Sequence, residues 1–273
     1  MRLFLIRHAE TVHNVGQIWA GTTDSPLTNH GMLQIQHLAK YFAASGIRFM
    51  HVFSSDLSRA RITAAGLCSE ASIEQVSSPI ETPYLRERSF GSLEGVSWHS
   101  TARSRDGSSS TKTATSVVHD QPETVESMRA RATAFVEEYL RPLMMGAAEE
   151  TVAVVAHGVI LSVLWECIAA LFRPESIRIG VEARSHRVFG ATVVVKPFWS
   201  NTGFMELMIE RPVKSLTQAS ISPPLADWTL TVLAIDNKPH LRNLRRTGGG
   251  IGSASHDPRQ QKIYRFFHPS PKT

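Results

Sequence analysis

An arginine and a histidine stand side by side at the end of the first apolar segment of the chain. Residues 2–6 form a short, largely apolar run that is typical of a buried strand, and Arg7 and His8 follow it directly. Burying a guanidinium and an imidazole is costly unless a ligand or a reaction uses them. Open α/β sheets carry their ligand sites at the carboxyl ends of strands. We therefore expect Arg7 and His8 to point into an anion site at the end of a sheet.

A second histidine repeats this pattern far along the chain. Residues 151–156 form a continuous apolar run, which is typical of a central parallel strand, and His157 ends it. An apolar helix is expected over residues 159–172. Because both predicted strands end in a histidine, we expect them to be neighbours that share one pocket.

Three further segments could contribute to such a pocket. Arg59 lies in the first turn of a helix expected after a strand at residues 49–53, where the helix dipole disfavours a cation, so its side chain is expected to reach outward to an anion. Asn14 can offer its amide to an oxyanion. The loop at residues 16–27, which includes Gly21 and Thr23, follows the first strand and is well placed to contact a ligand.

A carboxyl group could serve as the proton donor. The loop at residues 85–95 holds Glu87 and Glu94, and an acid near two arginines and a histidine can be tuned for proton transfer. For Glu94 we favour an ion pair with Arg86 or Arg88 instead. The spacing of residues around these groups is not that of a metal site.

The order of predicted elements indicates an α/β fold. We expect a three-layer α/β/α sandwich with a mostly parallel sheet and an antiparallel edge strand. Further strands are predicted at residues 74–82, 188–195, 203–209 and 228–235, and helices at 32–44, 57–65 and 123–145, with Thr28 as an N-cap and Pro142 as a kink or end. The predicted organisation is a catalytic domain over residues 1–211 and a basic C-terminal extension over 212–273. Within the domain, residues 96–121 form a Ser-rich insertion or lid.

Composition restricts the compartment and the partners. The chain has 273 residues, of which 42% are hydrophobic, and two cysteines, Cys68 and Cys167, in apolar contexts. Buried thiols suit a reducing compartment, no apolar run reaches membrane-spanning length, and no signal peptide is expected at the N-terminus. The sequence thus predicts a soluble cytoplasmic protein, with the nucleus left open. It does not indicate whether the chain forms a homo-oligomer.

The net charge of +5 comes from the end of the chain. From Lys238 onward the only acidic residue is Asp257, and without this segment the remaining body is slightly acidic. A basic tail can bind nucleic acid or an acidic partner, but we favour a solvated or self-docking tail.

Taken together, the motifs form a series that is typical of a known family. In order they are Arg7-His8-Ala9-Glu10-Thr11 with Asn14, Pro26-Leu27-Thr28 with Gly31, Ser55-Asp56-Leu57-Ser58-Arg59-Ala60 with Thr63, Leu85-Arg86-Glu87 with Phe90-Gly91 and Glu94-Gly95, and Ala156-His157-Gly158. This series resembles the histidine phosphatase superfamily, in its phosphoglycerate-mutase-like branch, over roughly residues 1–210. The segment from Asp236 is similar to tails of fungal members.

The resemblance implies a role for each site residue. His8 would be the nucleophile that becomes phosphohistidine, and Glu87 the general acid that protonates the leaving oxygen. Arg7, Arg59 and His157 would hold the phosphoryl group with help from Asn14. No cofactor is implied, and the substrate would be a small phosphorylated molecule.

The sequence favours a phosphatase over a phosphoglycerate mutase. In cofactor-dependent mutases the region after Gly95 resembles a longer, basic segment, whereas here it is Ser-rich and poor in Lys and Arg. Two alternatives stay open. The pocket could act on a non-phosphorylated metabolite in a specialised pathway, or it could sense anions without catalysis while the basic tail binds nucleic acid or protein.

Overall fold

A mostly parallel sheet forms the centre of the molecule. The computed structural model describes residues 1–69, 76–103, 121–146, 149–181, 183, 197–212, 224–248 and 250–259. Within these residues the sheet has seven strands in the order β3-β2-β4-β1-β6-β7-β5. The strands are β1 (Arg2–Arg7), β2 (His51–Ser55), β3 (Ile80–Thr82), β4 (Thr151–Ala156), β5 (Ile177–Ile179), β6 (Phe204–Glu210) and β7 (Thr229–Asn237).

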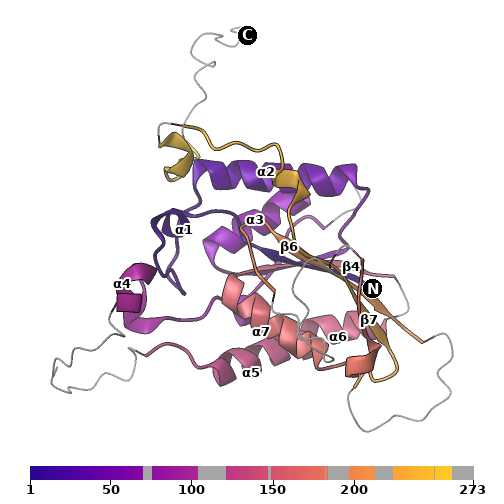
Figure 1. The fold of residues 1–273 in the computed structure, drawn as a ribbon. Coiled ribbons are helices and arrows are strands. Elements are labelled where there is room, and N and C mark those ends of the chain that lie inside the picture. Colours follow the sequence, from indigo (N-terminus) through magenta and orange to yellow (C-terminus); the bar gives the residue numbers. More distant parts are fainter. Residues whose placement is uncertain are drawn as a thin grey trace.

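Helices cover both faces of this sheet, as Figure 1 shows. Of these, α2 (Asn29–Ala44) and α3 (Ser58–Ser69) lie on one face, and α5 (Val125–Phe135), α6 (Arg141–Met145) and α7 (Gly158–Ala169) lie on the other, while α1 (Val12–Gly16) and α4 (Trp98–Arg103) lie to one side. One apolar cluster joins the sheet to α2 and α3, and a larger one joins it to α5, α6 and α7. The predicted three-layer α/β/α architecture is therefore confirmed.

The central strands explain why the site lies where it does. Phe4 and Ile6 of β1 face α2 and α3, while Leu3 and Leu5 face α5 and α7, so both faces of the strand are buried. β1 pairs in parallel with β4, and the register places Arg7 opposite Ala156. Both strands therefore end at the same level, and the residues that follow them meet at one edge of the sheet.

One expectation about the sheet needs correction. The antiparallel strand is not at the edge, because β6 lies between β1 and β7 and runs antiparallel to both. β7 corresponds to the strand predicted at residues 228–235, and its pairing with β6 extends the sheet beyond residue 211. Strand order depends on packing between distant segments, which local periodicity does not report.

Other element boundaries differ in detail from the predictions. The helix expected over residues 123–145 is divided into α5, a π-helical turn at Val136–Leu140, and α6, which begins just before Pro142. Proline cannot donate the backbone hydrogen bond of a regular helix, which explains this break. Of the strand predicted at residues 74–82, the described part forms β3 at Ile80–Thr82. The strand predicted at residues 188–195 lies outside the described residues, as does most of the Ser-rich insertion.

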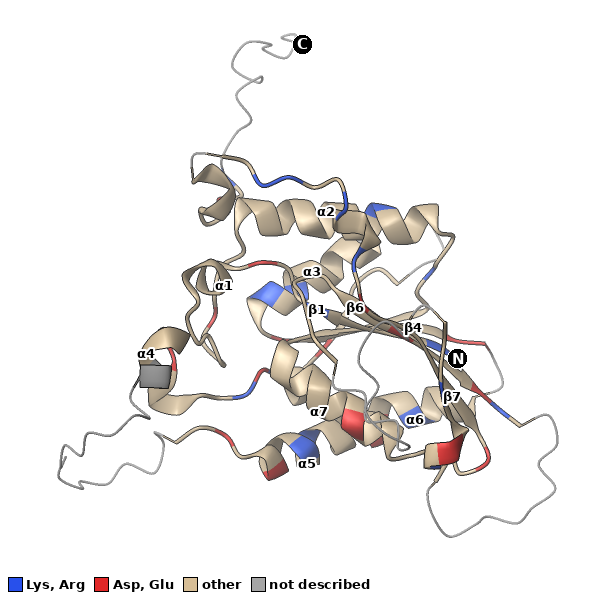
Figure 2. Cartoon of the chain, in the orientation of Figure 1, with Lys and Arg blue, Asp and Glu red and all other residues tan. Residues whose placement is uncertain are grey.

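The described part of the basic extension that follows β7 packs against α2 and the turn before it. The backbone N–H of Asn29 donates to the Ala254 carbonyl over 3.0 Å, and that of His256 donates to the Leu27 carbonyl over 2.8 Å. Arg246 forms an ion pair with Glu10, two residues after His8. Figure 2 marks the positions of Lys and Arg along this segment in blue. Within the described residues, no helix is both long and apolar enough to cross a bilayer.

Candidate active site

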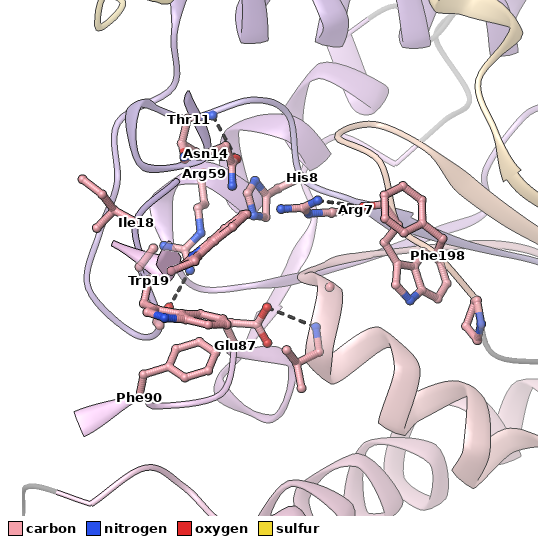
Figure 3. A pocket seen from close by; sticks show the side chains of 17 residues that line it. Arg7, His8, Thr11, Asn14, Ile18, Trp19, Arg59, Glu87, Phe90 and Phe198 are labelled. Carbon is pink, nitrogen blue, oxygen red and sulfur yellow. Dashed lines mark hydrogen bonds between the residues drawn. The ribbon is translucent and has the colours of Figure 1, made fainter. Parts of the chain in front are cut away.

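A cavity of about 230 Å³ opens at the carboxyl ends of β1 and β4 (Figure 3). Of the predicted site residues, Arg7, His8, Asn14, Gly21, Arg59 and Glu87 line it. His157 lies beside it, because its ring centroid is 5.0 Å from that of His8. Residues from four separate segments of the chain thus meet at one point, as the sequence predicts.

His8 is held with one nitrogen free for chemistry. Its Nδ1 lies 2.7 Å from the carbonyl oxygen of Ala9, and only a protonated nitrogen can make that hydrogen bond. In the neutral ring, Nε2 then carries the lone pair. The backbone N–H of His8 donates to the Ala156 carbonyl over 2.9 Å and ties the residue to β4. The arrangement presents Nε2 as a nucleophile.

His157 is held in the opposite tautomer. Arg59 Nε lies 3.2 Å from His157 Nδ1, and because a guanidinium only donates, Nδ1 must accept. The proton of the neutral ring is therefore on Nε2. This buried Nε2 has no hydrogen-bond partner among the described residues. An unpaired buried donor of this kind is suited to an oxyanion that enters the cavity.

The two histidines are kept neutral by their surroundings. Burial, and then the positive charges of Arg59 and Arg7, lower the pKa of His8 well below its ordinary value. Burial also lowers the pKa of His157 well below its ordinary value, followed by the charges of Arg59, His8 and Arg7 in that order. A neutral imidazole is the form that can attack phosphorus.

Arg7 and Asn14 complete the polar end of the cavity. Arg7 Nη1 donates to the Trp199 carbonyl over 2.7 Å, and its buried Nε has no partner among the described residues. The Asn14 side-chain oxygen accepts from the Thr11 backbone over 3.1 Å and from the Asn201 amide over 3.0 Å. Its oxygen is thus occupied, and the amide N–H donors are the groups left for an anion.

Glu87 sits at the N-terminus of α7. Its carboxylate accepts hydrogen bonds from the backbone N–H groups of Val159 and Ile160, each over 3.2 Å. The Glu87 loop is fixed by Arg131, which donates to the Tyr84 carbonyl over 2.7 Å and to the Arg86 carbonyl over 2.6 Å. The acid therefore has a defined position at the wall of the cavity (Figure 3).

The expected ion pair of Glu94 is wrong. Arg86 pairs with Asp56 instead, and the Arg88 side chain donates to the Glu123 carbonyl. Glu94 accepts backbone N–H bonds from Thr22, Thr23 and Phe90, over 3.0 to 3.1 Å. Burial raises the pKa of Glu94, but the hydrogen bonds from the Thr23 hydroxyl and from these N–H groups outweigh burial and lower it. Glu94 organises the loop that lies beside the cavity.

Gly21 and Thr23 contact Arg59 through their backbone carbonyl groups. Arg59 donates to the carbonyl oxygens of Gly21 and Thr23 over 2.6 and 2.9 Å, so the loop positions the guanidinium. Gly21 has a φ of +55°, and a Cβ there would lie 2.0 Å from the Glu94 carboxylate. The Thr23 hydroxyl donates to Glu94 over 2.5 Å, and Thr23 is not among the residues that line the cavity. Binding of substrate by Thr23 stays a prediction.

The segment at residues 199–202 was missed as part of the site. Its Trp199 carbonyl holds Arg7, and the Asn201 amide donates to both the His8 carbonyl and Asn14 over 3.0 Å. Thr202 has a φ of +56°, which is strained for a β-branched residue. The one available signal was the polar pair Asn201-Thr202 immediately before a predicted strand.

Metal ligation is not supported by the described residues. No group of three or more His, Cys, Asp or Glu side chains among them is placed to hold a metal ion. Besides the Glu87 carboxylate, the ionisable side chains that line the cavity are Arg7, His8 and Arg59, and two guanidinium groups suit an anion rather than a cation.

The sequence is similar to those of known phosphatases. The chain is 28% identical over 265 residues to a probable phosphatase of Schizosaccharomyces pombe, which covers 96% of this chain and 78% of that protein. It is 41% identical over 96 residues to a broad-specificity phosphatase of Saccharomyces cerevisiae, covering 35% of this chain and 41% of that protein.

A solved structure shows the same fold. A mycobacterial glucosyl-3-phosphoglycerate phosphatase superposes with a TM-score of 0.56 at 22% identity, covering 86% of this chain and 98% of that chain. The model of the histidine phosphatase superfamily (branch 1) matches residues 3–190, which include all the predicted site residues. The chain therefore belongs to the histidine phosphatase superfamily.

Proposed function

We propose that this chain is a metal-independent phosphatase that hydrolyses small phosphate monoesters through a phosphohistidine on His8. The observation that carries the proposal is the pair of opposite tautomers at the cavity. His8 offers a lone pair on Nε2, while His157 offers an N–H on its own Nε2. One ring can attack phosphorus while the other stabilises the oxygens around it.

The first step transfers the phosphoryl group to the enzyme. His8 Nε2 forms a bond to phosphorus as the bond between phosphorus and the leaving oxygen breaks. Arg7, Arg59 and His157 stabilise the charge on the three equatorial oxygens. Glu87 in its protonated form donates a proton to the leaving oxygen, so that an alcohol rather than an alkoxide departs.

The second step returns the enzyme to its starting state. A water molecule attacks phosphorus, and its proton passes to the Glu87 carboxylate while the bond to Nε2 of His8 breaks. Inorganic phosphate is released, Glu87 is protonated again and His8 is neutral. The proton that Glu87 gives to the leaving oxygen in the first step is therefore recovered from water in the second.

The compartment and the lineage are also proposals. Cys68 and Cys167 are both free thiols, and Cys167 is buried. This supports the reducing cytoplasm predicted from the sequence. Two of the curated relatives are yeast phosphatases, which supports the predicted fungal-like character.

Release of phosphate from a panel of monoesters tests the proposal. The assay compares the wild type with His8→Ala in the presence of a metal chelator, with His99→Ala as a control at an exposed histidine. We expect release by the wild type and by His99→Ala, and none by His8→Ala. Equal release by His8→Ala, or loss of wild-type activity on chelation, would contradict the mechanism.

A further inference from the structure

The cavity has two chemically different ends. Arg7 and Arg59 are at the end next to His8, and no other Lys or Arg is among the described residues that line it. The rest of the lining includes Ile18, Trp19, Phe90, Trp98, Phe198 and Trp199. A ligand that fills the cavity would therefore meet positive charge next to His8 and mostly aromatic side chains over the rest of the lining.

The aromatic side chains that line the cavity, namely Trp19, Phe90, Trp98, Phe198 and Trp199, form what we call its aromatic wall. The Trp19 ring lies 4.4 Å from that of Phe90 and 5.5 Å from that of Trp98, measured between centroids. Backbone hydrogen bonds fix Trp19, since its N–H donates to the Val96 carbonyl over 3.0 Å and its carbonyl accepts from Gly95 over 2.9 Å. Such preorganisation reduces the entropy cost of holding a ring in place.

Large apolar side chains remain exposed at this site. Phe198 is 68% exposed and Trp98 is 37% exposed, although both line the cavity. In Figure 3, Trp19 and Phe90 lie on one side of the cavity and Phe198 lies on the side of Arg7. Covering these rings with an apolar group would remove apolar surface from water, which is favourable.

The size of the cavity allows a ring as well as a phosphoryl group. Its volume is about 230 Å³. An apolar cavity of about 150 Å³ is enough to bind benzene. By contrast, a second phosphate would need its own cluster of donors, and the cationic side chains of the described lining are both next to His8.

We propose that the site prefers phosphate monoesters whose leaving group carries an aromatic ring or a similar flat apolar group. The inference rests on the proposed phosphatase function and names its substrate class. The phosphoryl group binds between Arg7 and Arg59, and the ring of the leaving group packs against the aromatic side chains of the lining, which include Trp19, Phe90 and Phe198. Sugar bisphosphates are then poorer substrates, because nothing among the described lining residues pairs with their second charge.

The test compares phenethyl phosphate with ethyl phosphate. Both leave as primary alcohols, so the chemistry is matched and the ring is the main difference. We expect kcat/KM to be about tenfold or more higher for phenethyl phosphate. We also expect it to exceed the value for fructose bisphosphate. Equal or higher kcat/KM for either competitor would overturn the inference while leaving the phosphatase intact; no release from any compound would count against the proposed function itself.

A variant locates the effect in the aromatic wall. Phe198→Ala removes an exposed ring and is expected to lower the ratio of kcat/KM for phenethyl over ethyl phosphate by about threefold to tenfold. Met145→Ala, which removes an exposed apolar side chain from α6, is the control and should leave the ratio unchanged. If the ratio of kcat/KM for phenethyl over ethyl phosphate is unchanged in Phe198→Ala, the proposed contact between Phe198 and the ring of the substrate is contradicted.

Discussion

Arg59 donates through Nε to Nδ1 of His157 over a distance of 3.2 Å, and this single contact assigns the proton of the histidine to Nε2. The neighbouring His8 has the opposite tautomer, because its Nδ1 donates to the Ala9 carbonyl. Two histidines that follow adjacent parallel strands thereby acquire different functions. The difference comes from what each Nδ1 contacts rather than from the strands themselves.

The hydrogen bond from Arg59 to His157 predicts that glutamine can partly replace His157. His157→Ala removes the donor to the phosphoryl oxygens, and we expect kcat/KM to fall by about 10² to 10³. In His157→Gln the side-chain oxygen can accept from Arg59 while the amide still donates, so the loss should be smaller. Steady-state kinetics of the two variants provide the check. Equal losses would show that the N–H donor is not what His157 supplies.

The proposed acid role of Glu87 predicts a dependence on the leaving group. Glu87→Gln keeps the shape of the side chain but cannot donate a carboxyl proton, so kcat/KM for alkyl phosphates should fall by about 10² to 10⁴. For p-nitrophenyl phosphate, whose leaving group needs no proton, the loss should be much smaller. Both rates are measured on the same preparation. A uniform loss for the two substrate types would count against the acid role.

His240 predicts a pH dependence of stability. Burial, reinforced by His37, lowers its pKa from 6.5 to about 4. As pH falls below 6.5 the unfolded chain takes up a proton at this residue while the folded chain does not, so the free energy of unfolding decreases. From pH 7.5 to pH 5 this amounts to about 2 kcal/mol.

Urea denaturation at the two pH values measures this contribution. In His240→Gln the decrease on acidification should be smaller by about 2 kcal/mol than in the wild type. His99→Gln alters an exposed histidine and should behave as the wild type does. The idea fails if His240→Gln loses as much stability on acidification as the unmodified chain.

Much of the site could be predicted because it depends on strand ends. Arg7, His8 and His157 each follow an apolar run, and the parallel register of β1 and β4 brings them together. Comparison with known proteins confirms the predicted superfamily, and with it a hydrolase of phosphate esters.

What could not be predicted depends on contacts between distant segments. Asn201 joins the site because β6 lies beside β1, an order that no local pattern encodes. Glu94 has two arginines nearby in sequence, yet it bonds to Thr22 and Thr23 across 72 and 71 positions of the chain. The closeness of Glu94 and Arg86 in the sequence gave the wrong ion pair, because Arg86 pairs with Asp56.

The ion pair between Arg246 and Glu10 predicts that the C-terminal extension stabilises the segment that follows His8. Glu10 is mostly buried and also accepts a hydrogen bond from the Thr28 hydroxyl over 2.8 Å. Arg246→Ala should therefore lower the free energy of unfolding by about 1 kcal/mol. The neighbouring Arg245 is exposed, and Arg245→Ala is the matched control. Thermal unfolding of the two variants decides the matter, and equal Tm values would contradict a supporting role.

The central claim is tested most directly by trapping the covalent intermediate. The enzyme is mixed briefly with a phosphate monoester that it hydrolyses, quenched in base, digested and analysed by mass spectrometry. We expect one phosphoryl group on the peptide that contains His8, with Nε2 as the attachment atom, and no label in His8→Ala. A phosphoryl group on a different residue, with turnover intact, would contradict the account.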